Sequence, residues 1–298
     1  MKKTIFTGAG VAIVTPMNAD GSINFDKLGE LIEWQIAEGT DAIIICGTTG
    51  ESSTMTDEEH IETIRYAVEK VNHRIPVIAG TGSNHTDYAV GLSKKAEEIG
   101  ADAILLVTPY YNKTSQRGLI THYTTIANAV DIPIILYNVP SRTGVNITPE
   151  TLKELSKVEN IVAVKEASGN ISQIARVAAL CGDDLDIYSG NDDQIVPIMA
   201  IGGKGVISVL SNVMPKETHE IAQLCLENKY PEAQAKMNKL VDFANNNGLF
   251  CDVNPIPVKE ALNIMGREVG ECRLPLVRME EAKIEKLRAK MAELGLAK

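Results

Sequence analysis

The sequence is poor in aromatic residues, paired cysteines and metal-binding histidine patterns. Aromatic residues make up 4% of its 298 residues, with a single tryptophan. The core must therefore be built from isoleucine, valine, leucine and alanine. The five cysteines are widely spaced and form no CxxC pair, which argues against a disulfide framework and suits a reducing cytosol. The five histidines form no HExxH pattern, so we expect no metal site.

Excess positive charge and long apolar runs are also missing. The formal net charge is −10 at pH 7, which argues against a nucleic-acid partner because phosphate contacts need a basic face. No stretch approaches the roughly 18 apolar residues of a membrane span. The Lys2-Lys3 pair and the apolar residues 5–14 superficially resemble a signal peptide, but small polar residues and glycines interrupt them. We therefore predict a first buried strand there and a cytoplasmic protein without a membrane partner.

Short apolar runs alternate regularly with amphipathic stretches along the chain. Strict alternation of strands and helices indicates a parallel sheet, and eight such units indicate an α/β fold, a (β/α)8 TIM barrel. A doubly wound open sheet is the alternative, although Gly80 and Gly82 match only part of the GxGxxG fingerprint. The predicted strands are Val11–Thr15, Asp41–Cys46, Pro76–Gly80, Asp102–Val107, Pro133–Tyr137, Ile161–Lys165, Asp186–Gly190 and Gly205–Val209.

The chain after the eighth strand is longer than the one helix that a barrel needs there. Its periodicity predicts several helices, and no flexible linker separates them from the barrel. We expect a barrel over residues 1–225 and a C-terminal helical domain over residues 226–298 that packs on it. The predicted helices are Pro215–Asn228, Pro231–Asn247, Pro257–Met265 and Glu280–Leu294.

The sixth predicted strand is unusual because its apolar run ends in a lysine. Residues 161–164 are β-branched apart from one alanine, which predicts a strand buried on both faces, and Lys165 follows directly. Burying an unpaired charge costs several kcal/mol, since even polar groups cost ~2–7 kcal/mol. A desolvated lysine has a lowered pKa and is a candidate amine nucleophile for a carbonyl substrate. A lysine that snorkels from the strand end to solvent is the alternative.

Polar residues follow several predicted strands at the barrel end where active sites form. Thr48 and Thr49 can offer hydroxyl and N–H groups to a carboxylate, or simply cap a helix. Tyr137 is either a core tyrosine or a proton carrier for an amine one strand away. Arg142 is either a solvated charge or a bidentate carboxylate clamp.

These residue types fit imine chemistry at Lys165. The amine adds to a keto group and loses water, and the resulting iminium withdraws electrons so that an enamine forms and attacks a second carbonyl compound. Each proton transfer needs a positioned donor, typically worth about 10²–10⁴-fold in rate. Tyrosine, with an ordinary pKa of ~10, is a poor lone base near neutrality. We therefore expect Tyr137 to act in a hydroxyl relay with Thr49 and a second tyrosine.

Six motifs carry a resemblance to a known family. GTTGES, TPYYN, YNVPSRTG, VKEASGN, GGKGVISV and NPIPVK, in this order and spacing, resemble the dihydrodipicolinate synthase family over nearly the whole chain. The resemblance implies a (β/α)8 barrel with a C-terminal helical domain, assembled as a homotetramer of two tight dimers. It implies condensation of pyruvate with L-aspartate 4-semialdehyde, on the route to diaminopimelate and lysine. The only covalent group that it implies is a pyruvyl imine on Lys165, with no separate cofactor.

The resemblance also implies a role for each site residue. Lys165 would form the Schiff base, and Tyr137, Thr49 and Tyr111 would form the proton relay, with Tyr111 reaching in from the neighbouring subunit. The implied substrate-binding residues are Thr48 and Thr49 for the pyruvate carboxylate, Arg142 for the semialdehyde carboxylate, and Gly190 and Ile207 through their backbone carbonyls.

Two alternative functions stay open at this point. N-acetylneuraminate lyases and keto-deoxy-sugar-acid aldolases share the lysine and the GxTGE motif. The paired threonines and Arg142 favour the synthase over the neuraminate lyases, whereas the sugar-acid aldolases are harder to exclude. A non-catalytic barrel that binds a ligand is disfavoured, because such a chain would be expected to lose Lys165, Tyr137 or a threonine.

Feedback inhibition by lysine is predicted to be weak or absent. Lysine-inhibited relatives have an effector pocket at the tight-dimer interface, and two of its positions differ here. Asp57 stands where such relatives have histidine, and Tyr88 stands where they have glutamate. Loss of the glutamate removes a charge-assisted contact to the effector's ammonium group, worth roughly 1.5–3 kcal/mol. The pocket residues that match are Ser52, His60, Asn84 and Tyr110.

Overall fold

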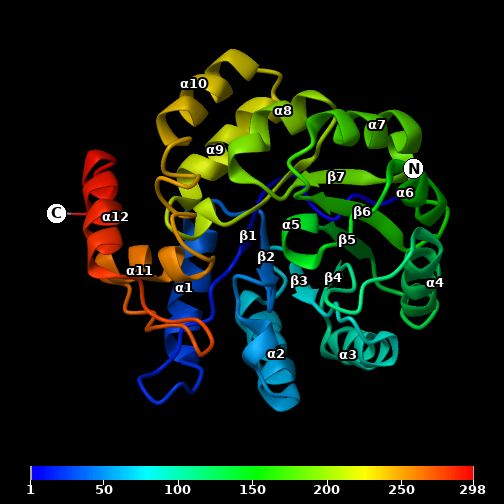
Figure 1. The fold of residues 1–298 in the computed structure, drawn as a ribbon, viewed down its shortest axis with the longest axis horizontal. Helices are drawn as coiled ribbons and strands as arrows, with labels where there is room; N and C mark the ends of the chain where they lie inside the picture. Colours follow the sequence, from blue (N-terminus) through cyan, green and yellow to red (C-terminus); the bar gives the residue numbers. More distant parts are fainter. Residues whose placement is uncertain (1, 298) are drawn as a thin grey trace.

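A closed barrel of eight parallel strands forms the centre of the molecule (Figure 1). The computed structural model describes residues 2–297. Each strand pairs with the next one along the chain, and β8 closes the barrel by pairing with β1. The predicted (β/α)8 barrel is therefore confirmed, and the open-sheet alternative is wrong. The strands are β1 (Gly8–Ala12), β2 (Ala42–Ile45), β3 (Val77–Gly80), β4 (Ala103–Val107), β5 (Ile134–Asn138), β6 (Ile161–Glu166), β7 (Asp186–Ser189) and β8 (Gly205–Ser208).

Helices surround the barrel, one after each strand, with a further short helix in the loop after β5. The start of the second helix follows its sequence pattern closely. Thr56 Oγ1 accepts from the Glu59 amide at 3.2 Å, and the Glu59 carboxylate accepts from the Thr56 amide at 3.0 Å, which is a complete capping box. The helices are α1 (Phe25–Ala37), α2 (Asp57–Val71), α3 (Thr86–Ile99), α4 (Gln116–Ala127), α5 (Pro140–Thr143), α6 (Pro149–Leu155), α7 (Ile171–Cys181), α8 (Ile195–Ala200) and α9 (Pro215–Leu226).

The first strand begins three residues earlier than predicted. The glycines at the start of this strand are typical of a loop, so the prediction left them out. It followed the apolar run and therefore extended to Thr15. The ladder needs those glycines, because a Cβ on Gly205 of β8 would lie 2.0 Å from the carbonyl oxygen of Gly8. Close approach of two backbones at the seam of the barrel explains why small residues stand there.

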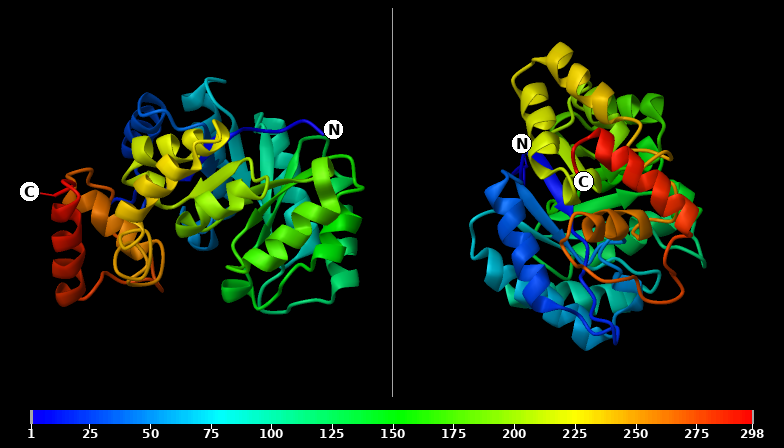
Figure 2. Two further views of the ribbon diagram at one scale, coloured as in Figure 1. Left: turned by 90° about the horizontal axis from the view of Figure 1, so that it is seen from above. Right: turned by 90° about the vertical axis from the view of Figure 1, so that its left-hand side faces the viewer.

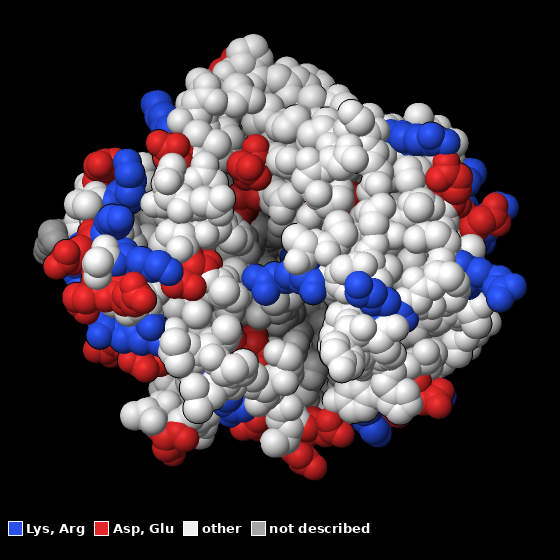
Figure 3. Space-filling view, in the orientation of Figure 1, with Lys and Arg blue, Asp and Glu red and all other residues white. Residues whose placement is uncertain are grey.

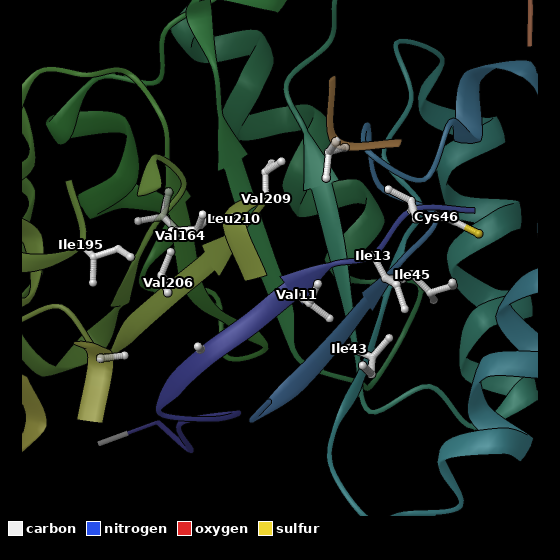
Figure 4. Packing of buried hydrophobic residues seen from close by; sticks show 14 of the residues in the cluster. Val11, Ile13, Ile43, Ile45, Cys46, Val164, Ile195, Val206, Val209 and Leu210 are labelled. Carbon is white, nitrogen blue, oxygen red and sulfur yellow. The ribbon is translucent and has the colours of Figure 1, made fainter. Parts of the chain in front are cut away.

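Side chains alternate between the inside of the barrel and the layer under the helices. Val11 of β1 and Ile43 of β2 are paired in the ladder, and Figure 4 shows them on neighbouring strands. Both belong to the cluster that includes buried residues of the surrounding helices. Ile44 and Ile207 belong instead to the inner cluster. The same alternation places Lys165 on the inner face of β6.

Three helices follow the barrel: α10 (Tyr230–Leu240), α11 (Ile256–Ile264) and α12 (Glu281–Glu293). Figures 1 and 2 show α11 beside the barrel and α12 outside it, at the edge of the molecule. The predicted helix to Asn247 was too long. Asn245 accepts a hydrogen bond from the Asn247 amide at 3.0 Å, a local turn that competes with helix. The last barrel helix ends at Leu226, and the division of the chain at residues 225 and 226 stays a prediction.

The described residues 2–297 include no helix that is long and apolar enough to span a bilayer. Their five cysteines are all free thiols.

Candidate active site

A cavity of about 420 Å³ lies at the carboxyl ends of the strands. Figure 3 shows the surface hollowed near its centre, with basic side chains at the edge of the hollow. The cavity brings together most of the residues that the sequence pointed to, from the ends of β2, β5, β6 and β7. The predicted residues in its lining are Thr48, Thr49, Tyr137, Arg142, Lys165 and Gly190.

Lys165 lies in this cavity and is only 5% exposed. Its position excludes the snorkelling alternative. The Nζ atom lies 4.3 Å from the centre of the Tyr137 ring, on the neighbouring strand. Burial lowers the pKa of Lys165 from 10.5 to about 8, against an opposing pull from Asp192. At neutral pH roughly a tenth of this amine is therefore unprotonated, far more than for an exposed lysine.

Asp192 is a buried carboxylate that the sequence analysis did not assign to the site. It accepts hydrogen bonds from the Ser208 hydroxyl at 2.5 Å and from the backbone amides of Val209 and Leu210 at 3.1 and 2.9 Å. Burial raises the pKa of Asp192, and these donors oppose the rise. Its charge favours the protonated form of Lys165, so it limits how far the pKa of the lysine falls. Its place directly after β7 was the available signal.

Tyr137 and Thr49 are buried hydroxyl groups in the same cavity. Burial raises the pKa of Tyr137 to about 12, with Arg142 opposing the rise. The phenol of Tyr137 is therefore protonated near neutral pH. It can donate a proton, but it is not available as a base in this state. Thr49 Oγ1 accepts a hydrogen bond from the side-chain amide of Asn254 at 2.9 Å. Thr48, beside it, is exposed at the cavity wall.

Gly190 lets the end of β7 approach the lysine. A Cβ there would lie 2.8 Å from the Cβ of Ala167 and 3.2 Å from Cε of Lys165. Any larger residue would therefore displace Lys165 or its neighbour, which explains glycine at this point of the lining.

Two of the predicted residues lie outside the cavity lining. Tyr111 is 92% exposed and has a positive φ of 67°. Ile207 is fully buried in the inner barrel cluster, paired with Gly10 of β1. Within this single chain, neither residue lines the cavity that holds Lys165.

The segment between α10 and α11 forms one wall of the cavity, which the sequence analysis missed. Asn254 contributes twice, because its backbone carbonyl also accepts from Nη2 of Arg142 at 3.2 Å. About two hundred residues separate this wall from the loop that carries Thr48 and Thr49, so local sequence pattern could not predict that they meet. The NPIPVK motif was the only feature of the sequence that pointed to this segment. The lining residues from this segment are Asn246, Phe250, Asp252, Val253 and Asn254.

A buried ion pair ties α11 to the threonine loop. Lys259 Nζ lies 2.8 Å from Glu51 Oε1, and both side chains are almost completely buried. Lys259 also donates to the carbonyls of Thr15 and Glu271, and the second Glu51 oxygen accepts from the Arg273 amide. Every polar group of the pair is thus engaged, as a buried pair requires. The helical extension thereby holds the loop that carries Thr48 and Thr49.

Comparison with known proteins assigns the family. The family model described as "Dihydrodipicolinate synthetase family" matches residues 5–294. The chain belongs to the dihydrodipicolinate synthase family. A 4-hydroxy-tetrahydrodipicolinate synthase from Acetivibrio thermocellus is 57% identical over 296 residues, which cover 99% of this chain and 100% of the relative. Its counterpart from Lachnoclostridium phytofermentans is 58% identical over 294 residues, covering 98% and 99%.

A solved structure of this family has the same architecture. The chloride-inhibited dihydrodipicolinate synthase from Acinetobacter baumannii, complexed with pyruvate, superposes with a TM-score of 0.96 at 43% identity, covering 98% of this chain and 100% of that one. The chain is accordingly an enzyme, a lyase of the dihydrodipicolinate synthase family in lysine and diaminopimelate biosynthesis. Among the described residues, no group of three or more His, Cys, Asp or Glu side chains is placed to hold a metal ion.

Proposed function

We propose that the chain condenses pyruvate with L-aspartate 4-semialdehyde through an imine on Lys165, giving 4-hydroxy-tetrahydrodipicolinate in the cytoplasm. The observation that carries the proposal is the buried Lys165, with its pKa lowered to about 8, in a cavity it shares with Tyr137 and Thr49. A neutral amine at this depth is a nucleophile without any metal or further cofactor.

The reaction follows from this placement. The amine of Lys165 adds to the keto carbon of pyruvate, and the carbinolamine loses its hydroxyl as water to give the iminium. A proton then leaves the pyruvyl methyl group, and the C–H electron pair forms the C=C bond of the enamine. The enamine carbon attacks the aldehyde carbon of the second substrate, whose oxygen takes up a proton, and the nitrogen of Lys165 is again an iminium. The amine of the second substrate then adds to the iminium carbon and displaces the amine of Lys165, which closes the ring and releases the product. Tyr137 and Thr49 stand in the same cavity as the lysine and can carry these protons.

The binding roles are distributed around the same cavity. Thr48 and Thr49 hold the pyruvate carboxylate, and Arg142 at the rim holds the carboxylate of the semialdehyde. Support for the second role comes from the contact between Arg142 and the wall residue Asn254, which keeps the guanidinium at the cavity. We assign backbone carbonyl contacts with substrate to Gly190 and Ile207.

Reductive trapping tests the proposal. Borohydride added with pyruvate should leave a reduced pyruvyl adduct on one lysine, and peptide mass spectrometry should locate it at Lys165. No adduct on the folded protein would overturn the proposal. Aspartate semialdehyde should then exceed sugar aldehydes as acceptor, in line with the two relatives described above, which are both named as synthases. Preference for a sugar aldehyde would favour the sugar-acid aldolase instead.

We propose that the enzyme is a homotetramer of two tight dimers in which Tyr111 completes the neighbouring site. The exposure of Tyr111, of Tyr110 beside it in the sequence and of Tyr88 suits a surface that a second subunit covers. Equal mixing of inactive Lys165→Ala and Tyr111→Phe variants under subunit exchange should recover about a quarter of wild-type activity, since half of the dimers are hybrids with one intact site. No recovery, with exchange confirmed by mass spectrometry of tagged subunits, would contradict the shared site.

We predict weak or absent inhibition by lysine. The two residues that differ from those of lysine-inhibited relatives, Asp57 and Tyr88, form a hydrogen bond with each other. The Tyr88 hydroxyl donates to the Asp57 carboxylate at 2.6 Å, so this bond competes with an ammonium group for the carboxylate. Relative to an inhibited enzyme, lysine should bind roughly 10–100-fold more weakly, as expected for one lost charge-assisted contact. Steady-state assays with added lysine check this, and a sub-millimolar inhibition constant would contradict it.

The other effector positions are partly engaged within the chain. His60 Nε2 lies 2.8 Å from the carbonyl of Gly80, and burial lowers the pKa of the histidine. The Asn84 side chain donates to the carbonyl of Tyr110 at 3.1 Å. With Ser52, these residues remain our proposed effector site. The variant Asp57→His/Tyr88→Glu should gain inhibition by lysine, and the single Asp57→His change is its control.

A further inference from the structure

Asn254 joins two catalytic elements that are far apart in the sequence. It is 6% exposed and lies in the cavity wall. Its Nδ2 donates to Thr49 Oγ1 at 2.9 Å, and its carbonyl accepts from Arg142 at 3.2 Å. Its Oδ1 is buried and has no partner within residues 2–297. A buried amide oxygen without a partner is costly, so the orientation of this amide is expected to serve a purpose.

The surroundings of Asn254 hold it in place. The helix α11 begins at Ile256, two residues later, and its Lys259 is bound to Glu51, two residues after Thr49. Two contacts, Asn254 to Thr49 and Lys259 to Glu51, therefore fasten the wall residue before α11 and the first turn of α11 to the same loop.

We propose that Asn254 is a positioning residue that makes the Thr49 hydroxyl a proton donor into the cavity. A hydroxyl group has one hydrogen and two acceptor sites. The N–H of Asn254 occupies an acceptor site, and within the described residues Asn254 is the only side-chain partner of this hydroxyl. The hydroxyl hydrogen is thereby left to point at Tyr137 or at a substrate bound to Lys165. Without the amide, the hydroxyl would rotate among its staggered positions.

The inference rests on the proposed imine function, and one half-reaction separates the two. In D2O, an enzyme that forms the enamine exchanges the methyl protons of pyruvate for deuterium without any second substrate, which ¹H NMR follows directly. Arg142 is not needed for this exchange, because it is assigned to the semialdehyde. The exchange therefore reports imine formation and the proton transfers at pyruvate without the semialdehyde step, and the borohydride adduct reports imine formation by itself.

The test compares Asn254→Ala with Asn254→Asp. Since a positioned proton donor is worth about 10²–10⁴-fold, partial loss of its orientation in Asn254→Ala should slow exchange ~10-fold. Asn254→Asp should slow it ~10²-fold, because the carboxylate would accept the Thr49 hydrogen and withdraw it from the cavity. In both variants the borohydride adduct on Lys165 should still form. Asn247→Ala and Asn247→Asp, at an exposed position of the same segment outside the lining, are the matched controls.

A double-mutant cycle with Thr49 separates positioning from general damage. In a Thr49→Val background, which lacks the hydroxyl, Asn254→Ala should have little further effect on exchange. An equal effect in both backgrounds would overturn the inference, and so would exchange within about twofold of wild type in both Asn254 variants. If Asn254→Ala fails to fold, the double-mutant cycle is measured with Asn254→Asp, which is nearly isosteric with the wild-type residue. Absence of the adduct in the wild-type enzyme would refute the proposed function instead.

Discussion

Replacing Lys165 with alanine should abolish turnover, lowering kcat by ~10³-fold or more because the covalent path is removed. Lys165→Arg should be equally inactive, since a guanidinium keeps the charge but is not a nucleophile at neutral pH. Steady-state assays of condensation and borohydride trapping with pyruvate measure the two effects. Neither variant should yield an adduct on any other lysine.

The structure supplies a control for this change. Lys216 is an exposed lysine at the start of α9, outside the cavity lining. Lys216→Ala should therefore retain wild-type turnover and the adduct at Lys165. Substantial condensation by Lys165→Ala, or an adduct that survives in it, would show that another group carries the imine.

The second large effect is expected on stability. Lys259→Met should lower the free energy of unfolding by ~3–5 kcal/mol, because it leaves the Glu51 carboxylate buried without its partner. Activity should fall as well, since Glu51 anchors the loop that carries Thr48 and Thr49. Urea unfolding followed by circular dichroism measures the loss. The double variant Glu51→Gln/Lys259→Met should recover much of the stability, because it removes both charges together.

An exposed pair in the same part of the chain is the matched control. Lys236 and Glu220 approach to 2.6 Å, and their side chains are 45% and 37% exposed, against 2% and 1% for Lys259 and Glu51. Lys236→Met should cost ~0–1 kcal/mol, as is usual for surface ion pairs. If Lys259→Met cost no more than Lys236→Met, the buried pair would have no special role in holding the loop.

Local sequence pattern was sufficient for the barrel and for the polar groups at the strand ends. The short apolar runs and the turn residues that follow them are local properties, so each strand could be recognised from a few residues. Lys165 could be singled out for the same reason, because a charge at the end of a fully apolar strand is visible in the sequence alone. The strand boundaries were accurate except at β1, where the glycines that allow β1 to approach β8 look like a loop when taken alone.

Tertiary structure alone decided the surroundings that give these groups their chemistry. Asn254 and Lys259 lie about two hundred residues from the threonine loop that they hold, and no local pattern records a contact across that distance. Folding also brings the charge of Asp192 close to Lys165, where it limits the fall in the pKa of the lysine, and brings Tyr88 to Asp57. Periodicity indicates which face of a helix or strand is buried. The pKa values, the hydrogen-bond directions and the cavity walls depend instead on which distant residues the tertiary fold places against that face.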